Sequence, residues 1–320
     1  MTADSSLLRL VAELYYVRDW NEQSIARLLG FSRSKVSRLL TTARSEGIVQ
    51  ITLTPETSVL DPLSAEVAGS LGIPVRLTPG RAVDSASAGR LCAVAAAPLI
   101  AADLPQEGVV GVAGGYTVSA LVDALAPMSR PGVTVVPIVG SYYVQDSNLD
   151  VNAVASALGR HLGASSRRIL APGLLDSLDT KMALLQDSAV RATTELWQQL
   201  DLVVLGVSGS PTDRPGYATV MDQLDAGGRA RLHAKGVVGE VAGHLLSADG
   251  TLVEDEWTSR ALSIPVELVR DCRRVVAIAV GEAKVPAIVA SVKAGLVKLL
   301  YTDESTARAI LARTVPSRAG

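Results

Sequence analysis

The chain of 320 residues has few aromatic side chains. Aromatic residues make up 3 % of it, whereas hydrophobic residues in total make up 48 %, so a large core must consist mainly of Val, Leu, Ile and Ala. Such a composition suits parallel strands that are covered by helices on both faces. At roughly 100–200 residues per domain, the length predicts about two domains.

Side chains that form disulfides or metal sites are also scarce. Cys92 and Cys272 are far apart and each lies in an apolar stretch, so we expect buried free thiols rather than a disulfide framework or a zinc site. His161, His233 and His244 are scattered, without metal-ligand spacing. The sequence therefore predicts no metal site and no cofactor.

A long hydrophobic run is missing as well. Residues 91–102 form the longest nearly apolar segment, but they include Pro98 and are too few to cross a bilayer. Residues 1–6 are polar as a group, which is not typical of a signal peptide. We therefore expect a cytoplasmic protein with no membrane partner.

The charge is unevenly distributed, although the formal net charge is only −2. Basic side chains outnumber acidic ones by two in residues 1–53, whereas acidic side chains outnumber basic ones by four in the remainder. A mildly basic head on an acidic body fits a small nucleic-acid-binding module joined to a domain with another kind of partner.

The beginning of the chain has the pattern of a helix-turn-helix. Apolar residues recur at helical spacing over residues 5–17, a second helix starts after Asn21, and a third begins after Ser32 and reaches about residue 45. Gly30 can adopt the left-handed conformation that a sharp turn between helices requires. Residues 48–53 alternate apolar and polar side chains, which predicts a strand at the edge of a wing.

The third predicted helix carries hydrogen-bonding and basic side chains on one face. No acid lies between Phe31 and Ser45. Such a face can enter the major groove, where arginine reads guanine and serine contacts bases or phosphates. We expect Lys35 and Arg44 to contact phosphates, which adds affinity without sequence preference. The plain alternative is a solvated face of a structural or partner-binding head that meets no DNA. The predicted DNA-contacting residues are Ser32, Arg33, Ser34, Lys35, Ser37, Arg38, Thr41 and Arg44.

Beyond the head, strand-like and helix-like segments alternate, which predicts a parallel α/β sheet. We therefore predict a DNA-binding domain over residues 1–54, a proline-containing linker over residues 55–62, and an effector-binding and oligomerisation domain over residues 63–320. The predicted strands are residues 75–77, 108–112, 133–139, 168–171, 202–207, 275–280 and 296–301. The predicted helices are residues 86–101, 117–126, 149–162, 178–200, 285–294 and 303–313.

Three glycine-bearing turns follow predicted strands, at the edge where parallel sheets bind ligands. The first, Gly114-Gly115-Tyr116-Thr117, opens a helix, so its N–H groups and the Thr117 hydroxyl can cradle an anion. The second contains Gly140 and the third contains Gly281. Glycine turns are also common strand-to-helix joints, so each turn by itself is equally consistent with a structural role.

In their order along the chain, these features resemble the SorC family of sugar-responsive bacterial regulators. The resemblance covers nearly the whole chain and rests on the head, the Gly-Gly-Tyr-Thr turn, the strand-turn 135–140, the strand 201–206, the pair Gly239-Glu240, the turn 281–284 and the segment 301–304. It implies a winged helix-turn-helix and a Rossmann-like effector domain similar to the sugar-phosphate isomerase fold. It also implies a homo-oligomer, a dimer or tetramer, whose binding to double-stranded operator DNA changes when a sugar or sugar phosphate binds.

The resemblance also suggests which residues bind the effector. It places a phosphate-type loop at the first glycine turn and a second loop at Glu282 and Lys284. The predicted effector-binding residues are Gly114, Gly115, Tyr116, Thr117, Gly140, Ser141, Tyr142, Gln145, Asn148, Asp222, Glu240, Glu282 and Lys284.

One departure from the family pattern affects the nature of the effector. Phosphosugar-binding members resemble one another in carrying Lys or Arg before the glycine of the second turn, where this chain has Val139. Without that cation, a multiply phosphorylated ligand is disfavoured, whereas Tyr142 and Tyr143 can stack on an apolar or aromatic ring. We expect an effector that is unphosphorylated or singly phosphorylated, either a sugar or a non-sugar.

A sugar-phosphate isomerase is the alternative function of the large domain. Such chemistry needs a carboxylate base with an acid or lysine beside it. Enzymes of that fold place an Asp-Gly-Ala-Asp stretch after a central strand, where this chain has Val-Ser-Gly-Ser over residues 207–210. Asp213 and Asp222 lie further on. We therefore predict a sensor and not an enzyme.

Overall fold

The computed structural model describes residues 5–49, 61–78, 85–142, 144, 146–210 and 224–314. The chain divides into two compact units, Met1–Ser58 and Val59–Gly320. The predicted linker lies outside the described residues except for its last two, which begin helix α4 (Asp61–Leu71). Among the described helices, none combines the length and the apolar character that crossing a membrane requires.

The small unit is built from three helices, and local hydrogen bonds fix where the second and the third begin. Helix α1 (Ser5–Ala12) continues into a π-helical turn (Glu13–Val17), and is followed by α2 (Glu22–Leu29) and α3 (Arg33–Ser45). The side chains of Asn21 and Ser32 cap α2 and α3, and Gly30 ends α2 with a φ of 66°. These ends agree with the sequence prediction.

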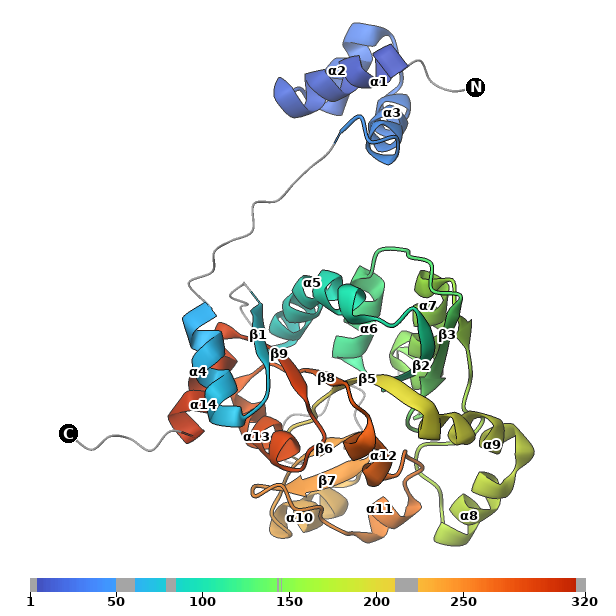
Figure 1. Ribbon diagram of the computed structural model, residues 1–320, viewed down its shortest axis with the longest axis vertical. Coiled ribbons are helices and arrows are strands. Elements are labelled where there is room, and N and C mark those ends of the chain that lie inside the picture. Colours follow the sequence, from blue (N-terminus) through green and yellow to red (C-terminus); the bar gives the residue numbers. More distant parts are fainter. Residues whose placement is uncertain are drawn as a thin grey trace, which may run out of the picture. The chain divides into compact units, whose positions relative to one another are not determined.

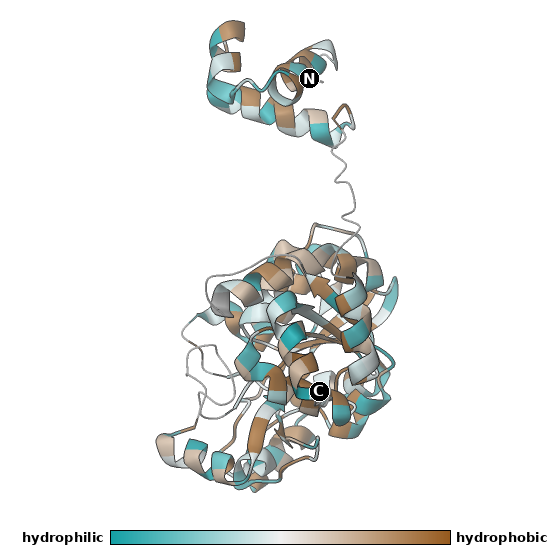
Figure 2. Cartoon of the chain, turned by 90° about the vertical axis from the view of Figure 1, so that its left-hand side faces the viewer, coloured by the Kyte–Doolittle hydropathy of each residue, from teal (hydrophilic) through white to brown (hydrophobic). Residues whose placement is uncertain are grey.

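Apolar stripes hold the three helices together. Leu8, Ile25, Val36 and Ala43 are fully buried between them, and bands of hydrophobic and hydrophilic residues alternate along the helices (Figure 2). The predicted wing strand lies outside the described residues apart from its first two, which are not in a strand, so the wing remains a prediction.

The large unit contains a seven-stranded sheet in the order β1-β9-β8-β5-β2-β3-β4, and every neighbouring pair in it is parallel. The strands are β1 (Val75–Thr78), β2 (Glu107–Val112), β3 (Gly132–Pro137), β4 (Ser165–Ser166), β5 (Leu200–Gly206), β8 (Val275–Ile278) and β9 (Leu299–Asp303). The long helices that accompany them are α5 (Ser85–Asp103), α6 (Tyr116–Ala124), α7 (Val151–Leu162), α13 (Val285–Lys293) and α14 (Glu304–Thr314).

Apolar side chains project from both faces of this sheet. Along β5, Leu202 and Val204 join a core with α5, α6 and α7, whereas Val203 and Leu205 join a second core on the opposite face with α4, α13 and α14. The helices accordingly lie in two layers with the sheet between them (Figure 1). This arrangement confirms the predicted parallel α/β fold, and the aliphatic composition follows from it because the strands are covered on both faces.

The order of the strands creates a switch point between β2 and β5. From β2 the chain moves outward to β3 and β4, and it then returns to β5 on the other side of β2, from where it continues to β8. Connections that leave two adjacent strands in opposite directions open a crevice at their carboxyl ends, which is where open α/β sheets bind ligands.

Two predicted elements were wrong. No strand forms at residues 168–171, and the short strand β4 precedes them. The reason is that the side-chain amide of Asn152 bonds both backbone groups of Ile169, accepting from its N–H at 2.7 Å and donating to its C=O at 3.1 Å. The predicted helix 178–200 is interrupted at Asp187, whose extended backbone ends α8 (Leu178–Gln186) and whose side chain caps α9 (Ser188–Thr194).

A smaller antiparallel layer was not predicted. Strands β6 (Val237–Val241) and β7 (His244–Ser247) form a hairpin whose two turn residues, Ala242 and Gly243, have φ values of 50° and 86°. Short helices accompany the hairpin and the sheet: α10 (Ala226–Ala234), α11 (Glu256–Arg260) and α12 (Val266–Asp271). The expectation of buried free thiols is confirmed for both cysteines.

A buried carboxylate, that of Asp255, links α10 to the beginning of α11. It accepts hydrogen bonds from Arg231 at 3.1 Å, from Lys235 at 2.8 Å and from the N–H of Trp257 at 2.9 Å. Burial by itself raises the pKa of Asp255, but these hydrogen bonds outweigh burial and hold the pKa well below its ordinary value.

This pKa makes stability depend on pH in the acid range. Since the folded-state pKa is depressed, the stabilisation is fully present above about pH 4, the ordinary aspartate value, and is lost as pH falls through the folded-state pKa. We expect Asp255→Asn to lower the free energy of unfolding by about 2 kcal/mol at pH 7, because hydrogen bonds to a charged group are lost. The loss should shrink towards pH 2 in urea titrations.

Glu304→Gln is the matched control, because it breaks a surface ion pair with Arg308 of 2.7 Å. Exposed pairs contribute little, so this variant should unfold with nearly the parent stability. Equal losses in the two variants, or a loss in Asp255→Asn that does not vary with pH, would contradict the role given to Asp255.

Candidate effector pocket and DNA-reading face

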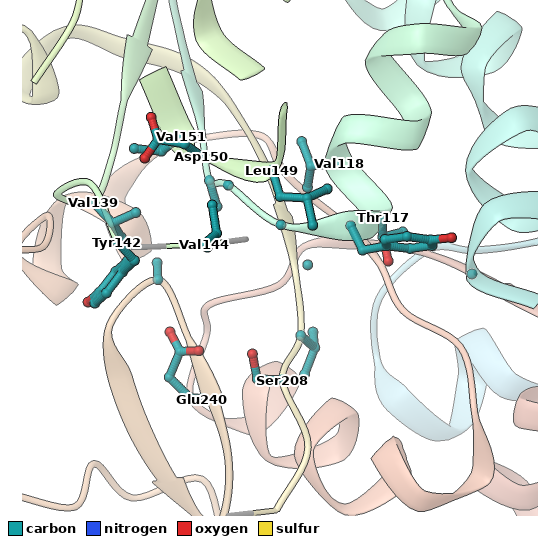
Figure 3. Close-up of a pocket in the computed structure, with 18 of the residues that line it drawn as sticks. Thr117, Val118, Val139, Tyr142, Val144, Leu149, Asp150, Val151, Ser208 and Glu240 are labelled. Carbon is teal, nitrogen blue, oxygen red and sulfur yellow. The ribbon is translucent and has the colours of Figure 1, made fainter. Parts of the chain in front are cut away.

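A cavity of about 140 Å³ lies at the switch point, where β2 and β5 end. Its walls come from the turns after β2, β3, β5 and β8, from the beginning of α7 and from the hairpin β6–β7 (Figure 3). Segments that are far apart in the sequence therefore meet in one pocket. Each wall contributes a different chemistry.

The beginning of α6 forms one wall. Gly114, Gly115, Tyr116 and Thr117 line the cavity, and within the described residues no side chain caps the helix. Gly114 is required there, because a Cβ atom would lie 2.8 Å from the carbonyl oxygen of Leu149. A helix N-terminus favours negative charge or a hydroxyl oxygen, so this wall suits the polar end of a ligand.

The hairpin provides an acidic wall. Glu240 of β6 is 6 % exposed, and its carboxylate accepts a hydrogen bond of 2.5 Å from the N–H of Gly243. Its backbone bonds that of Ser208, the residue beyond β5, and the two side chains both line the cavity (Figure 3). Burial raises the pKa of Glu240, and the bonds from Gly243 and Ser208 oppose that rise only in part. The carboxyl group of Glu240 can form a hydrogen bond with a hydroxyl group of a ligand.

The turn after β3 and the start of α7 supply a tyrosine and a second carboxylate. The hydroxyl of Tyr142 donates to the carbonyl of Gly173 at 3.1 Å, and burial together with the charge of Glu240 raises its pKa. Asp150 caps α7 and accepts a hydrogen bond of 2.5 Å from the hydroxyl of Ser141. Both Tyr142 and Asp150 line the cavity.

The rest of the lining is largely aliphatic and carries little positive charge. Val139, Val144, Leu149 and Val151 contribute apolar side chains to the lining (Figure 3). Among the described lining residues, Lys284 is the one cation, against the carboxyl groups of Asp150 and Glu240. The pocket therefore suits a ligand with hydroxyl groups, one apolar face and little negative charge.

The predicted effector-binding residues fall into three groups. The cavity brings together Gly114, Gly115, Tyr116, Thr117, Tyr142, Glu240 and Lys284. Four others do not line the cavity that the described residues form: Gly140, Ser141, Asn148 and Glu282. Gln145 and Asp222 lie outside the described residues. Asp150 and Ser208 line the cavity but were not predicted as effector-binding residues.

Gly140 has a steric role in the structure. A Cβ atom there would lie 2.5 Å from the carbonyl oxygen of Pro172 and 2.6 Å from the Cα of Gly173. We expect Gly140→Ala to lower the free energy of unfolding by about 1–3 kcal/mol, the usual range for overpacking. Gly206→Ala is the control, since its Cβ would meet no described atom within 4 Å. Urea unfolding of both variants checks this. Equal stability of the two variants would show that the backbone at Gly140 can move away from that of Pro172 and Gly173.

The predicted DNA-reading residues share the exposed side of α3, whereas Val36, Leu39, Leu40 and Ala43 are buried. Arg33 donates to Glu22 at 2.9 Å, and Arg38 donates to the carbonyl of Ser34 at 3.3 Å. Lys35 lies 3.7 Å from the centroid of the Phe31 ring. The Oγ of Ser32 caps the helix, so Ser32 also has a structural role.

A helix-turn-helix unit and a ligand pocket at the switch point of a parallel sheet together define an effector-responsive transcription regulator. Comparison with known proteins leads to the same class. The family model Sugar-bind, described as "Putative sugar-binding domain", matches residues 74–312.

Several relatives match over almost their full length. The sorbitol operon regulator of Klebsiella pneumoniae is 28 % identical over 317 residues, which are 96 % of this chain and 98 % of the relative. The deoxyribonucleoside regulator of Bacillus subtilis is 25 % identical, with 94 % and 95 % covered. The crystal structure of full-length SorC from Klebsiella pneumoniae has a TM-score of 0.74 at 27 % identity and covers 96 % of this chain and 99 % of that one. The chain belongs to the SorC family of transcriptional regulators with a sugar-binding domain.

Proposed function

We propose that this chain binds operator DNA through the exposed face of α3 and that a small hydroxyl-bearing effector in the pocket changes this binding. The observation that carries the proposal is the cavity at the β2–β5 switch point, in a chain whose relatives are named operon regulators. The effector acts by binding one state of the protein more tightly than another, since only differential affinity shifts such an equilibrium.

The charges of the pocket favour a neutral or singly phosphorylated effector. Asp150 and Glu240 would repel phosphate groups on their side, and a single phosphate has a favourable place only near Thr117 and Lys284. Val139 occupies the place where phosphosugar-binding members carry a cation, which also supports an effector that is neutral or singly phosphorylated. The relatives named for sorbitol, erythritol and deoxyribonucleosides also suggest a ligand rich in hydroxyl groups.

We propose a sensor and not a sugar-phosphate isomerase, because the relatives are named as regulators. We further propose a DNA-binding domain over residues 1–54, a linker over residues 55–62, and a homodimer or tetramer assembled by the large unit. A dimer would present two recognition helices to successive major grooves, about one helical turn apart.

Two measurements on the full chain test this function. A thermal-shift screen of polyols, sugars, sugar phosphates and small aromatic acids should yield a stabilising compound, because a ligand at about 100 times its Kd adds roughly 2.7 kcal/mol of stability. Binding to the promoter DNA of its own operon should weaken steeply as salt rises, since lysine and arginine contacts release counterions. Operator binding that ignored both salt and the stabilising compound would refute the proposal.

A further inference from the structure

An ion pair joins the beginnings of the two helices of the helix-turn-helix. The Nε of Arg33, the first residue of α3, donates to Oε2 of Glu22, the first residue of α2, at 2.9 Å. The side chain of Glu22 is only 23 % exposed, whereas that of Arg33 is 74 % exposed. The carboxylate is thus partly enclosed by the head, while most of the guanidinium remains accessible.

Both partners stand on helix ends that are fixed independently of the pair. Asn21 accepts a hydrogen bond of 2.9 Å from the N–H of Ser24 and so defines where α2 begins. Ser32 accepts one from the N–H of Lys35 and defines where α3 begins. The acceptor oxygen of Glu22 is therefore presented at a defined place to the first side chain of the recognition helix.

The ion pair occupies the Nε of Arg33 and leaves its terminal nitrogens available for a base. A guanidinium has five N–H donors, of which Nε carries one and the two terminal nitrogens carry four. Arginine reads guanine with two parallel bonds to O6 and N7. Since Glu22 engages Nε, both terminal nitrogens of Arg33 can still point together at a base. Arg38 has no such acidic support in the described residues, because its Nε bonds the carbonyl of Ser34 in its own helix.

We propose that Glu22 is a positioning residue, which holds the guanidinium of Arg33 by its Nε so that the terminal nitrogens face one guanine of the operator. The inference rests on the proposed function, because it gives one head residue a part in sequence reading. A free arginine side chain loses much rotamer freedom when it is fixed on a base. The ion pair already restricts the rotamers of Arg33 before DNA binds, so less rotamer freedom is lost on binding. It therefore favours the one base that matches the position in which the guanidinium is held.

A purely electrostatic role for Glu22 makes the opposite prediction. An acid near DNA repels the phosphates of every sequence alike, so its removal should strengthen binding without changing the preferred base. The two roles of Glu22 therefore predict different changes in the preferred DNA sequence, which a selection experiment measures directly.

The experiment selects binding sites from a random duplex DNA library with the full chain and its variants. Arg33→Ala identifies the base pair whose preference depends on Arg33. Glu22→Ala removes both the charge and the acceptor, whereas Glu22→Gln removes the charge and keeps an acceptor oxygen. Glu13→Gln is the matched control, because Glu13 pairs with Arg18 at 2.8 Å in the same unit but outside α2 and α3.

We expect Glu22→Ala to reduce the preference for guanine about tenfold at the Arg33-dependent base pair and at no other, a typical share of bidentate discrimination. Glu22→Gln should retain most of that preference, and Glu13→Gln should select the parent site. If Glu22→Ala and Glu22→Gln both select the parent site with equally raised affinity, the positioning role is refuted while the proposed function stands. If the parent chain enriches no sequence, the DNA-binding function itself fails.

Discussion

Replacing Gly206 by leucine is expected to weaken the effector response strongly while leaving DNA binding without effector intact. Gly206 ends β5 and lines the cavity, and no described atom lies within 4 Å of the position that its Cβ would take. A larger side chain can therefore enter the space that the effector needs without displacing the backbone. We expect effector affinity to fall by roughly ten- to a hundredfold, because forcing extra methylene groups into a packed site costs about 1–3 kcal/mol.

The measurement is the thermal shift caused by the compound that stabilises the parent chain, together with its effect on promoter binding. Gly206→Ala is the control, since a single methyl group fits and should leave the response close to that of the parent. Gly206→Leu should melt near the parent temperature without the compound. A Gly206→Leu variant that still responds with parent affinity would show that the effector binds elsewhere.

Local signals in the sequence were sufficient for the small unit. Asn21, Gly30 and Ser32 each act within three or four residues of their own position, as a cap, a left-handed turn and a second cap. Features of this kind are determined by neighbouring backbone atoms. The sequence could therefore predict where α2 and α3 begin and where α2 ends without knowledge of the rest of the fold.

Features that depend on distant partners could not be predicted in this way. Residues 168–171 have the apolar character of a strand, but the side chain of Asn152, on α7, takes the backbone bonds of Ile169 that a strand would need. The β6–β7 hairpin turns on Ala242 and Gly243, and this pair differs from the Asn-Gly or Asp-Gly that usually marks such a turn. A local pattern was misleading in the first case and missing in the second.

The pocket likewise combines features that local sequence predicts with features that depend on distant partners. Its α6 wall was predicted because a glycine-rich turn before a helix is a recognisable signal. Asp150 and Ser208 were not predicted, since they reach the cavity only when α7 and β5 meet at the switch point. Sequence reasoning thus predicted the anion-favouring wall of the pocket, and the structure adds two polar groups and an aliphatic wall. These additions agree with the expectation, drawn from Val139 in the sequence, of an effector that is unphosphorylated or singly phosphorylated.

Arg38→Ala is expected to remove the preference of the helix-turn-helix for one base pair of the operator. Arg38 lies on the exposed face of α3, one turn after Ser34, whose carbonyl accepts from its Nε at 3.3 Å. With Nε bound to the helix, the terminal nitrogens are available for a base, as they are in Arg33. We expect operator affinity to fall about ten- to a hundredfold, the usual range for one bidentate base contact, whereas affinity for unrelated DNA should fall only a few-fold.

Lys35→Ala provides the contrast that separates base reading from phosphate binding. Lys35 lies over the Phe31 ring at 3.7 Å, on the same helix as Arg38. Its loss should weaken operator and unrelated DNA alike and lower the slope of log K against log salt by about one, since one phosphate contact disappears. Titrations of both variants at several salt concentrations, with the effector present and absent, make the comparison. If Arg38→Ala weakened both DNAs equally, Arg38 would be a phosphate contact, and the reading of bases by α3 would have to depend on Arg33 and the serine side chains.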